Sequence, residues 1–316
     1  MGNFSDIDSA FTRDELKGGT FEPAYSGAVS FMRRKYSRDL KGVDVAVTGI
    51  PFDTATTNRP GTRFGPRHIR AESSQIAWGP PYNWDYEPFD RLAVVDYGDC
   101  HFDHGKPATI PGAIEDHIAG ILKAGAAALT LGGDHYISYP VLKAHAAKHG
   151  PLSLIQFDAH TDTWADDDPT RVDHGTMFYR AVKDGIVVPE KSVQIGIRTI
   201  NDDPLGVNIL DAPFVHQNGP QAVVDEVKRI VGDNKTYITF DIDGLDPAYA
   251  PGTGTPVIAG LTPWQAQTII RGLAGINLVG MDVVEVAPAY DNSGITGLAA
   301  ATLAYDILAL YAWNKA

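Results

Sequence analysis

Cysteine and basic residues are scarce in this sequence. Cys100 is the only cysteine among 316 residues, which rules out an intrachain disulfide or a cysteine-based zinc site and favours a reducing compartment. Lysine and arginine total 26 against 39 acidic residues, for a net charge of −13. Nucleic acids and anionic membrane surfaces call for basic patches, so this charge argues against both as partners. It is compatible with a cationic small substrate, and equally with acidity that only keeps the protein soluble.

Long uninterrupted apolar runs are also missing. None approaches the roughly 20 residues that span a bilayer. The first residues carry acids and lack the apolar core of a signal peptide, so we expect a cytoplasmic protein with no membrane partner. Hydrophobic residues nevertheless make up 44% of the chain, which is enough for a sizeable core.

The sequence does contain short β-rich apolar runs that alternate with helical patterns. Eight runs are expected as strands: residues 43–50, 92–98, 127–131, 152–157, 192–197, 207–210, 236–240 and 278–286. Helical patterns cover residues 66–78, 113–125, 138–150, 175–185, 220–232, 262–275 and 297–313. This alternation predicts a three-layer α/β/α fold around a central, mostly parallel sheet of about eight strands. We expect a single domain over residues 1–316, with residues 1–40 as an N-terminal arm.

Acidic and imidazole side chains collect where the predicted strands end. Four strands run into such residues, namely His135, the set Asp158, His160 and Asp162, the pair Asp241 and Asp243, and Glu285. Ligands of open parallel sheets bind beyond the carboxyl ends of the strands. Residues i and i+2 of an extended chain share a face, so each set can converge on one point. A single aspartate at a strand end is usually a cap, but clusters on three strands are hard to assign to capping.

Four carboxylates and two imidazoles would repel one another or lose solvation if they converged without a cation. They are also too many for one structural zinc ion, which normally takes four ligands. The pattern therefore favours two divalent metal ions that share bridging carboxylates. Asp134, in the same turn as His135, is expected only to orient the loop.

These motifs resemble the signatures of the ureohydrolase family, which includes arginases, agmatinases and guanidinobutyrases. The resemblance is carried by GGDH at residues 132–135, FDAHTD at 157–162 and FDIDGLDPAYAPGTGTP at 240–256. It extends over nearly everything from about residue 43 onward. DAHTDTW, DHGTMF and GMDVVEVAPAYD look closest to agmatinases, and the fold that the resemblance implies is arginase-like.

The resemblance also implies which residue serves which metal. The first ion would be held by His135, Asp158, Asp162 and Asp241, and the second by Asp158, His160, Asp241 and Asp243. Asp158 and Asp241 would then bridge the two ions. The family usually uses Mn²⁺, which suits an oxygen-rich ligand set with two imidazoles, and the same donors would also take Ni²⁺.

Three residues are expected to act on the substrate. Two metal ions can lower the pKa of a water molecule, and Asp162 is placed to help move its proton. The resemblance assigns to Glu285 a paired hydrogen bond with the guanidinium plane of the substrate. His174, in DHGTMF, is the candidate acid that protonates the leaving amine. The alternative for His174 is an ordinary histidine near a helix N-terminus.

The predicted reaction is hydrolysis of a guanidino compound to urea and an amine, and we favour agmatine, which yields putrescine. Guanidine, an alkylguanidine or biguanide, and guanidinobutyrate are alternative substrates, with nickel as the alternative metal. A non-catalytic subunit of a mixed assembly is an alternative of another class, against which the intact ligand set argues. The resemblance implies a homo-oligomer, either a trimer or a hexamer, with a hetero-oligomer as the alternative.

Two segments bear on the tail of the substrate. The three acids from Asp166 to Asp168 would attract the distal ammonium of agmatine, unless they form only a solvated loop. The aromatic residues Trp78, Tyr82, Trp84 and Tyr86 would form a rim for a substituted guanidine, unless they serve only as packing at a subunit contact.

Overall fold

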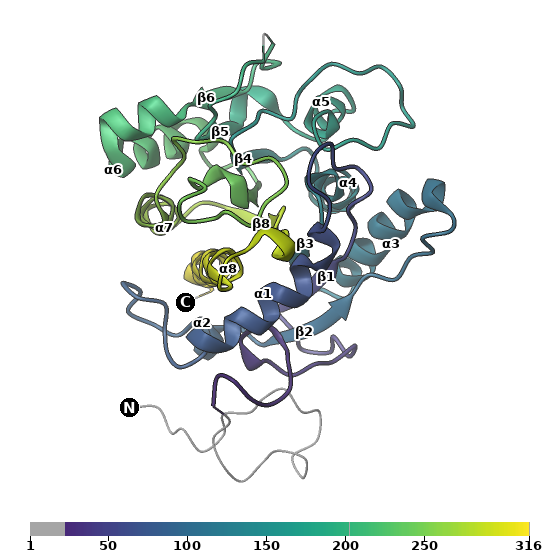
Figure 1. Ribbon diagram of the computed structural model, residues 1–316, viewed down its shortest axis with the longest axis vertical. Helices are drawn as coiled ribbons and strands as arrows, with labels where there is room; N and C mark the ends of the chain where they lie inside the picture. The colour runs from purple at the N-terminus through teal and green to yellow at the C-terminus, as the bar shows by residue number, and fades with distance from the viewer. Residues whose placement is uncertain (1–22, 202, 316) are drawn as a thin grey trace.

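A computed structural model of the protein describes residues 23–201 and 203–315, which are arranged around one eight-stranded sheet (Figure 1). The strands are β1 (Val45–Ile50), β2 (Val94–Asp99), β3 (Ala127–Gly132), β4 (Ser153–Phe157), β5 (Val193–Ile195), β6 (Asn208–Leu210), β7 (Thr236–Asp241) and β8 (Leu278–Val284). All neighbours pair in parallel, in the order β2-β1-β3-β8-β7-β4-β5-β6. The eight predicted strands and the three-layer arginase-like fold are confirmed.

Successive strand residues enter two different hydrophobic cores. In β3, Leu129 and Leu131 belong to one core and Ala128 to the other. Alternate side chains of a strand point to opposite faces of the sheet. Both faces are covered here, so the strands read in the sequence as continuous apolar runs rather than as alternating ones.

The helices cover both faces of the sheet (Figure 1). They are α1 (Gly65–Ser73), α2 (Pro88–Arg91), α3 (Ile110–Lys123), α4 (Ser138–His149), α5 (Met177–Lys183), α6 (Ala212–Val231), α7 (Pro263–Gly272) and α8 (Ile295–Trp313). Helices α3, α4 and α5 pack together on one side, and α1, α8, α7 and α6 form the layer on the other. The sequence predicted every helix except the short α2.

Helix α6 is longer than predicted because it consists of two segments. Gly219 has non-helical angles (φ 78°, ψ 167°), and Pro220 opens the second segment, where the sequence placed the start of the helix. The first segment begins after Asp211, whose side chain accepts a hydrogen bond from the N–H of Phe214.

Helix α8 is, by length and composition alone, apolar enough to cross a membrane, with a mean hydropathy of 1.5 in its 18-residue window. The sequence analysis expected no apolar run long enough to span a bilayer. It did not identify this helix because polar residues such as Asp306 interrupt its apolar sequence. Within the protein, 72% of that window is buried, and the helix packs against α1, α7 and β8. Its apolar composition is accounted for by this packing.

The predicted N-terminal arm is described in part. Residues 1–22 lie outside the described residues. Residues 23–40 are largely irregular, with one short 3-10 turn at Phe31–Arg33. They are joined to β2 of the same chain, since Tyr36 bridges to Asp96 and the N–H of Phe31 donates to the Asp96 carboxylate over 2.8 Å.

Candidate metal centre

Strands β3, β7 and β4 bring the predicted ligands to one edge of the sheet, with β8 lying between β3 and β7. In the order β3-β8-β7-β4 all strands are parallel, so their carboxyl ends lie side by side. His135 opens a 3-10 turn (His135–Ile137) after β3, and Asp158 directly follows β4. Asp241 ends β7, and Asp243 lies in the turn that follows (Ile242–Gly244). Sheet topology thus joins segments that lie up to about a hundred residues apart in the chain.

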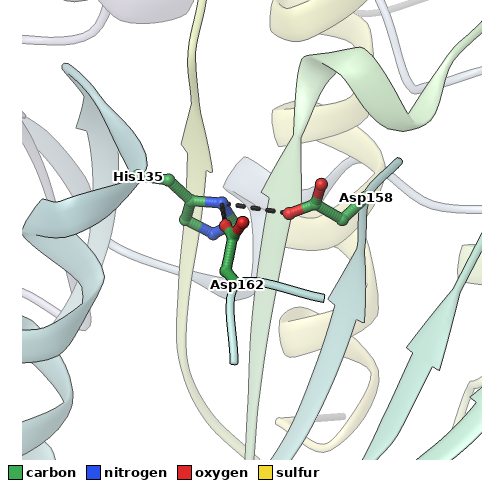
Figure 2. A group of neighbouring side chains, drawn as sticks. All are labelled: His135, Asp158 and Asp162. Carbon is green, nitrogen blue, oxygen red and sulfur yellow. Dashed lines mark ion pairs between the residues drawn. The ribbon is translucent and has the colours of Figure 1, made fainter. Parts of the chain in front are cut away.

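The first group of ligand atoms surrounds the Nδ1 atom of His135 (Figure 2). Nδ1 lies 3.1 Å from Asp158 Oδ2 and 3.1 Å from Asp162 Oδ2, and the Asp241 Oδ2 atom is 3.2 Å away. The imidazole is 1% exposed, and Nδ1 is buried without a hydrogen-bond partner. One aromatic nitrogen facing three carboxylate oxygens is a donor set that a divalent cation satisfies.

The second group surrounds His160. Its Nδ1 atom lies 3.2 Å from Asp243 Oδ2 and 3.5 Å from Asp158 Oδ1. Asp158 therefore offers one oxygen to each group, which is the arrangement of a bridging ligand. The geometry of Asp241 is one-sided: Oδ2 faces His135, while Oδ1 accepts the N–H of Asp243 over 2.8 Å. A bridging role of Asp241 rests on the resemblance alone.

The electrostatics of this cluster are those of a cation site. Burial raises the pKa of Asp241 and Asp243, and it raises the pKa of Asp162 to about 6. Burial alone would lower the pKa of His160, but the hydrogen bonds to Asp158 and Asp243 outweigh it and raise that pKa to about 12. Four carboxylates thus lie close together in a buried volume, where they repel one another, and bound cations would offset this repulsion.

Two site residues have strained backbones. Asp162 has φ 53° and Glu285 has φ 64°, in the left-handed region that non-glycine residues rarely adopt. Such conformations are costly and persist only where the surrounding structure holds them, typically at functional sites. Both side chains are turned into the site in this way, which supports their selection from the sequence.

Glu285 and His174 form a pair beside the first group. The Oε1 atom of Glu285 accepts the backbone N–H of His135 over 2.8 Å and lies 3.0 Å from His174 Nδ1. Its other oxygen, Oε2, is buried without a hydrogen-bond partner. The backbone N–H of Thr57 donates to His174 Nε2 over 3.1 Å, and the Thr57 hydroxyl is 2.9 Å away.

Two influences on the protonation of His174 oppose each other. Burial lowers its pKa, but the Glu285 carboxylate outweighs this and raises the pKa to about 9. The amide of Thr57, in contrast, can donate to Nε2 only if that nitrogen carries a lone pair. The backbone fixes the direction of this amide, so the amide determines the state of Nε2. The arrangement then has a neutral ring with its proton on Nδ1, shared with Glu285.

A cavity of about 290 Å³ opens over this cluster. It is lined by Thr57, His160, Asp162, Trp164, Arg171, Asp173, His174, Gly175, Thr176, Asp241 and Thr255. A larger cavity of about 470 Å³ lies at the opposite end of the strands, where β3 and β8 begin. The smaller one is lined by three of the proposed ligands, His160, Asp162 and Asp241, whereas none of the six lines the larger one. The smaller cavity is therefore the candidate substrate site.

The structure does not support two expectations about the cavity mouth. None of the three acids lines the cavity: Asp166 pairs with Arg171, Asp167 accepts from the Tyr179 hydroxyl, and Asp168 caps the N–H of Thr170. The acid that does line it is Asp173. The carboxylates of Asp166, Asp167 and Asp168 instead interact with neighbouring polar groups of the protein.

The aromatic segment before β2 packs on α8 rather than around the cavity. The indole of Trp84 donates to Asp306 over 2.9 Å, and the Tyr86 hydroxyl donates to the Ala309 carbonyl. Neither residue, nor Trp78 or Tyr82, is among the cavity-lining residues.

The sequence analysis did not identify the residues that form hydrogen bonds with the proposed metal ligands. The Gln156 side chain donates to Asp158 Oδ2 over 2.8 Å, and Gln194 donates in turn to Gln156. The Thr239 hydroxyl contacts His135 Nε2 and donates to the Asp282 carboxylate. Polar residues inside otherwise apolar strands were the available signal, since they must find partners when buried. Asp134 has the orienting role expected of it, accepting the N–H groups of Tyr136 and Ala55.

Comparison with known proteins agrees with this geometry. The chain is 59% identical to an agmatinase of Chromobacterium violaceum over 96% of this chain and 94% of the relative. A hypothetical agmatinase from Burkholderia thailandensis, solved by crystallography, superposes with a TM-score of 0.94 at 58% identity and covers 98% of both chains. Proclavaminate amidino hydrolase from Streptomyces clavuligerus superposes at 0.87 with 37% identity, over 92% of this chain and 99% of that one. Residues 43–310 match the arginase family, and the chain belongs to that family.

Proposed function

We propose that this protein hydrolyses agmatine to putrescine and urea at a two-metal centre, as a hydrolase of C–N bonds in linear amidines. The similarity to agmatinases along nearly the whole chain supports the substrate. The observation that carries the two-metal centre is Asp158, which offers one carboxylate oxygen to each of two ligand groups.

The proposed ligands are the six predicted from the sequence: His135, Asp158, His160, Asp162, Asp241 and Asp243. The orphaned Nδ1 of His135, buried among three carboxylates, is the feature that fits such a group. When bound, two divalent ions supply a water molecule of lowered pKa and stabilise developing negative charge. We propose Mn²⁺ as the natural metal, with Ni²⁺ as the alternative that this donor set also accepts.

Glu285 is proposed to orient the guanidinium group. Its Oε1 atom is already engaged by the N–H of His135 and by His174. Oε2 is therefore the oxygen left to accept a guanidinium N–H, and burial makes that charge-assisted bond strong. The protein contributes one free carboxylate oxygen in a fixed direction, so the guanidinium carbon is held in one place.

Asp162 and His174 are proposed to move protons. Asp162 lines the cavity within the ligand cluster and accepts a proton from the attacking water. His174 Nε2 carries a lone pair at rest, so it first receives the proton that Asp162 has taken from the water and then passes it to the departing amine. The Thr57 hydroxyl, 2.9 Å from Nε2 and also at the cavity wall, lies on this path. Glu285, on the opposite ring nitrogen, stabilises the imidazolium that exists transiently.

Asp173 is proposed to receive the distal ammonium of agmatine, in place of the three acids favoured from the sequence. It lines the cavity, and its Oδ2 atom is paired with Arg171 at 3.1 Å. Arg171 is about half exposed, so it can yield that oxygen to a substrate cation at little cost.

We further propose a single catalytic domain that assembles as a homo-trimer or homo-hexamer in the cytoplasm. Exposed apolar side chains support self-association, among them Trp264 (65% exposed) and Ile258 (80%) near α7. A non-catalytic role in a mixed assembly remains the alternative, and activity of the purified chain alone would exclude it.

The decisive experiment is urea release by the purified chain after reconstitution with Mn²⁺ or Ni²⁺ separately. The substrates are agmatine, guanidinobutyrate, arginine, guanidine and a biguanide, and metal content is measured in parallel. We expect two ions per chain and the highest kcat/KM with agmatine. Release of no urea from any of them with either metal would refute the proposed function.

A further inference from the structure

The proposed metal ligand His135 is joined through its Nε2 atom to a chain of buried hydroxyl and carboxyl groups. While Nδ1 faces the carboxylates, Nε2 lies 2.8 Å from the Thr239 hydroxyl on β7. That hydroxyl in turn donates to Asp282 Oδ1 on β8 over 2.5 Å. Thr239 and Asp282 are fully buried, so no water takes the place of either partner.

The direction of every bond in this chain is determined by Asp282. Its Oδ2 atom accepts from the hydroxyls of Ser138 and Tyr237, each over 2.8 Å, while Oδ1 accepts from Thr239. Three hydroxyl donors therefore surround one carboxylate, which as an anion can only accept. Because the Thr239 hydrogen is committed to Asp282, the Thr239 oxygen can only accept from His135.

That acceptor determines the tautomer of His135. The proton of the neutral ring must lie on Nε2, where it is donated to Thr239, and the lone pair is then on Nδ1. Nδ1 is the atom that lies 3.1–3.2 Å from the oxygens of Asp158, Asp162 and Asp241. The hydrogen-bond chain thus presents a ligand lone pair to the point where these three carboxylates converge.

We propose that Thr239 and Asp282 are positioning residues that keep His135 in its metal-binding tautomer, and that they govern the affinity of the ion held by His135 but not of the ion held by His160. This inference rests on the proposed two-metal centre. The selectivity follows from the geometry, because the chain ends on His135 alone. The Nδ1 atom of His160 faces Asp158 and Asp243, and its side chain is 19% exposed and hence open to water.

The test compares metal binding by the full-length enzyme and its Thr239→Val variant, which keeps the side-chain volume and removes the hydroxyl. Mn²⁺ affinities of both sites are measured by competition with a chelator. Removing a partner of this kind typically weakens metal binding 10- to 100-fold. We expect that loss at one site only, and near wild-type affinity with Thr239→Ser, which restores the hydroxyl.

Thr48→Val is the matched control. Thr48 is a fully buried threonine on β1 of the same sheet, and its hydroxyl likewise contacts a histidine, with His117 Nε2 at 2.7 Å. It lies away from the metal cluster, so its variant reports the general effect of losing a buried threonine–histidine contact. We expect its unfolding midpoint to fall while both metal affinities stay unchanged.

Three results would overturn the inference, and they are distinguishable. If wild type binds two ions and releases urea, but Thr239→Val binds both as tightly, only the role of Thr239 and Asp282 is refuted. If wild type binds no ions, the proposed metal centre fails as well. Equal weakening at both sites would show a general distortion and would also count against the inference. Asp282→Asn, which places an amide donor in the chain, is expected to reproduce the one-site loss.

Discussion

At the scale of single residues, this site depends on carboxylates whose two oxygens do different things. Asp158 directs one oxygen to each ligand group. Glu285 commits Oε1 to the protein and leaves Oε2 free. Asp173 uses one oxygen to cap Gly175 and the other to pair with Arg171. Such divided roles can be tested by exchanging a carboxylate for its amide, which retains one acceptor oxygen and removes the charge.

Glu285→Gln should lower kcat by at least about 100-fold, in the range found when a transition-state contact is removed. The amide oxygen can still accept from the His135 N–H, so the thermal unfolding midpoint should change little. Steady-state kinetics with agmatine and a thermal unfolding scan measure the two effects. A variant with near wild-type kcat would remove Glu285 from the mechanism.

Asp173→Asn should raise the KM for agmatine about tenfold, which corresponds to ~1.4 kcal/mol of lost binding. The turnover of guanidine, which has no distal ammonium, should not change. Asp168→Asn, in the same loop but with a side chain that accepts from Thr170 and lies outside the cavity lining, is the control. Equal effects on the two substrates would argue that Asp173 only supports the loop.

At the scale of elements, the turns that follow the strands position the proposed ligands. The turn after β3 is closely packed, because Gly133 has φ +23° and passes close to the backbone at the end of β1 and just after it. A Cβ atom there would lie 2.6 Å from the Phe52 carbonyl oxygen and closer still to that of Ile50. The next residues are Asp134 and His135, so glycine at this position lets the turn bring the proposed ligand His135 to the cluster.

Gly133→Ala should therefore destabilise the protein and weaken metal binding together. Gly125→Ala is the comparison: Gly125, before the start of β3, also has positive φ (+97°), but a Cβ there meets nothing within 4 Å. Left-handed strain alone costs about 1–2 kcal/mol, so Gly125→Ala should lose roughly that and keep its metal affinity. Chemical unfolding and metal titration of both variants test this. Metal affinity retained in Gly133→Ala would contradict the close-packed turn.

At the scale of the whole molecule, some buried histidines take no part in the chemistry. His145 lies between α4 and the sheet, where burial lowers its pKa to about 4, and burial also lowers that of His117 to about 4. Both are neutral in the folded protein, whereas in the unfolded chain they bind protons near pH 6.5. At these two sites the unfolded state thus binds more protons between about pH 6.5 and 4.

The contribution of these two histidines to the free energy of unfolding should therefore be fully retained above about pH 6.5 and fall as the pH drops towards 4. Each histidine adds a slope of up to about 1.4 kcal/mol per pH unit. His145→Gln should flatten this dependence by about one proton, while exposed His101→Gln should leave it unchanged. Urea unfolding at several pH values, with a chelator present throughout, measures the slopes. Identical slopes for wild type and His145→Gln would refute the assignment.

The sequence by itself determined the strands and the fold class, and it yielded the set of proposed ligands. Continuous apolar runs and acids placed two residues apart are local patterns, and local patterns can be recognised from the amino-acid sequence alone. It also singled out Glu285 and Asp162, whose strained backbones only the structure reveals.

Only the tertiary structure decided which groups face one another. It assigned one oxygen of Asp158 to each histidine, replaced Asp166–Asp168 with Asp173 at the cavity, and placed Thr239 and Asp282 behind His135. These contacts join β3, β4, β7 and β8, which are neighbours in the sheet but not along the chain. The partners of a buried polar group depend on strand order and side-chain direction, and neither can be read from the spacing of residues within one segment.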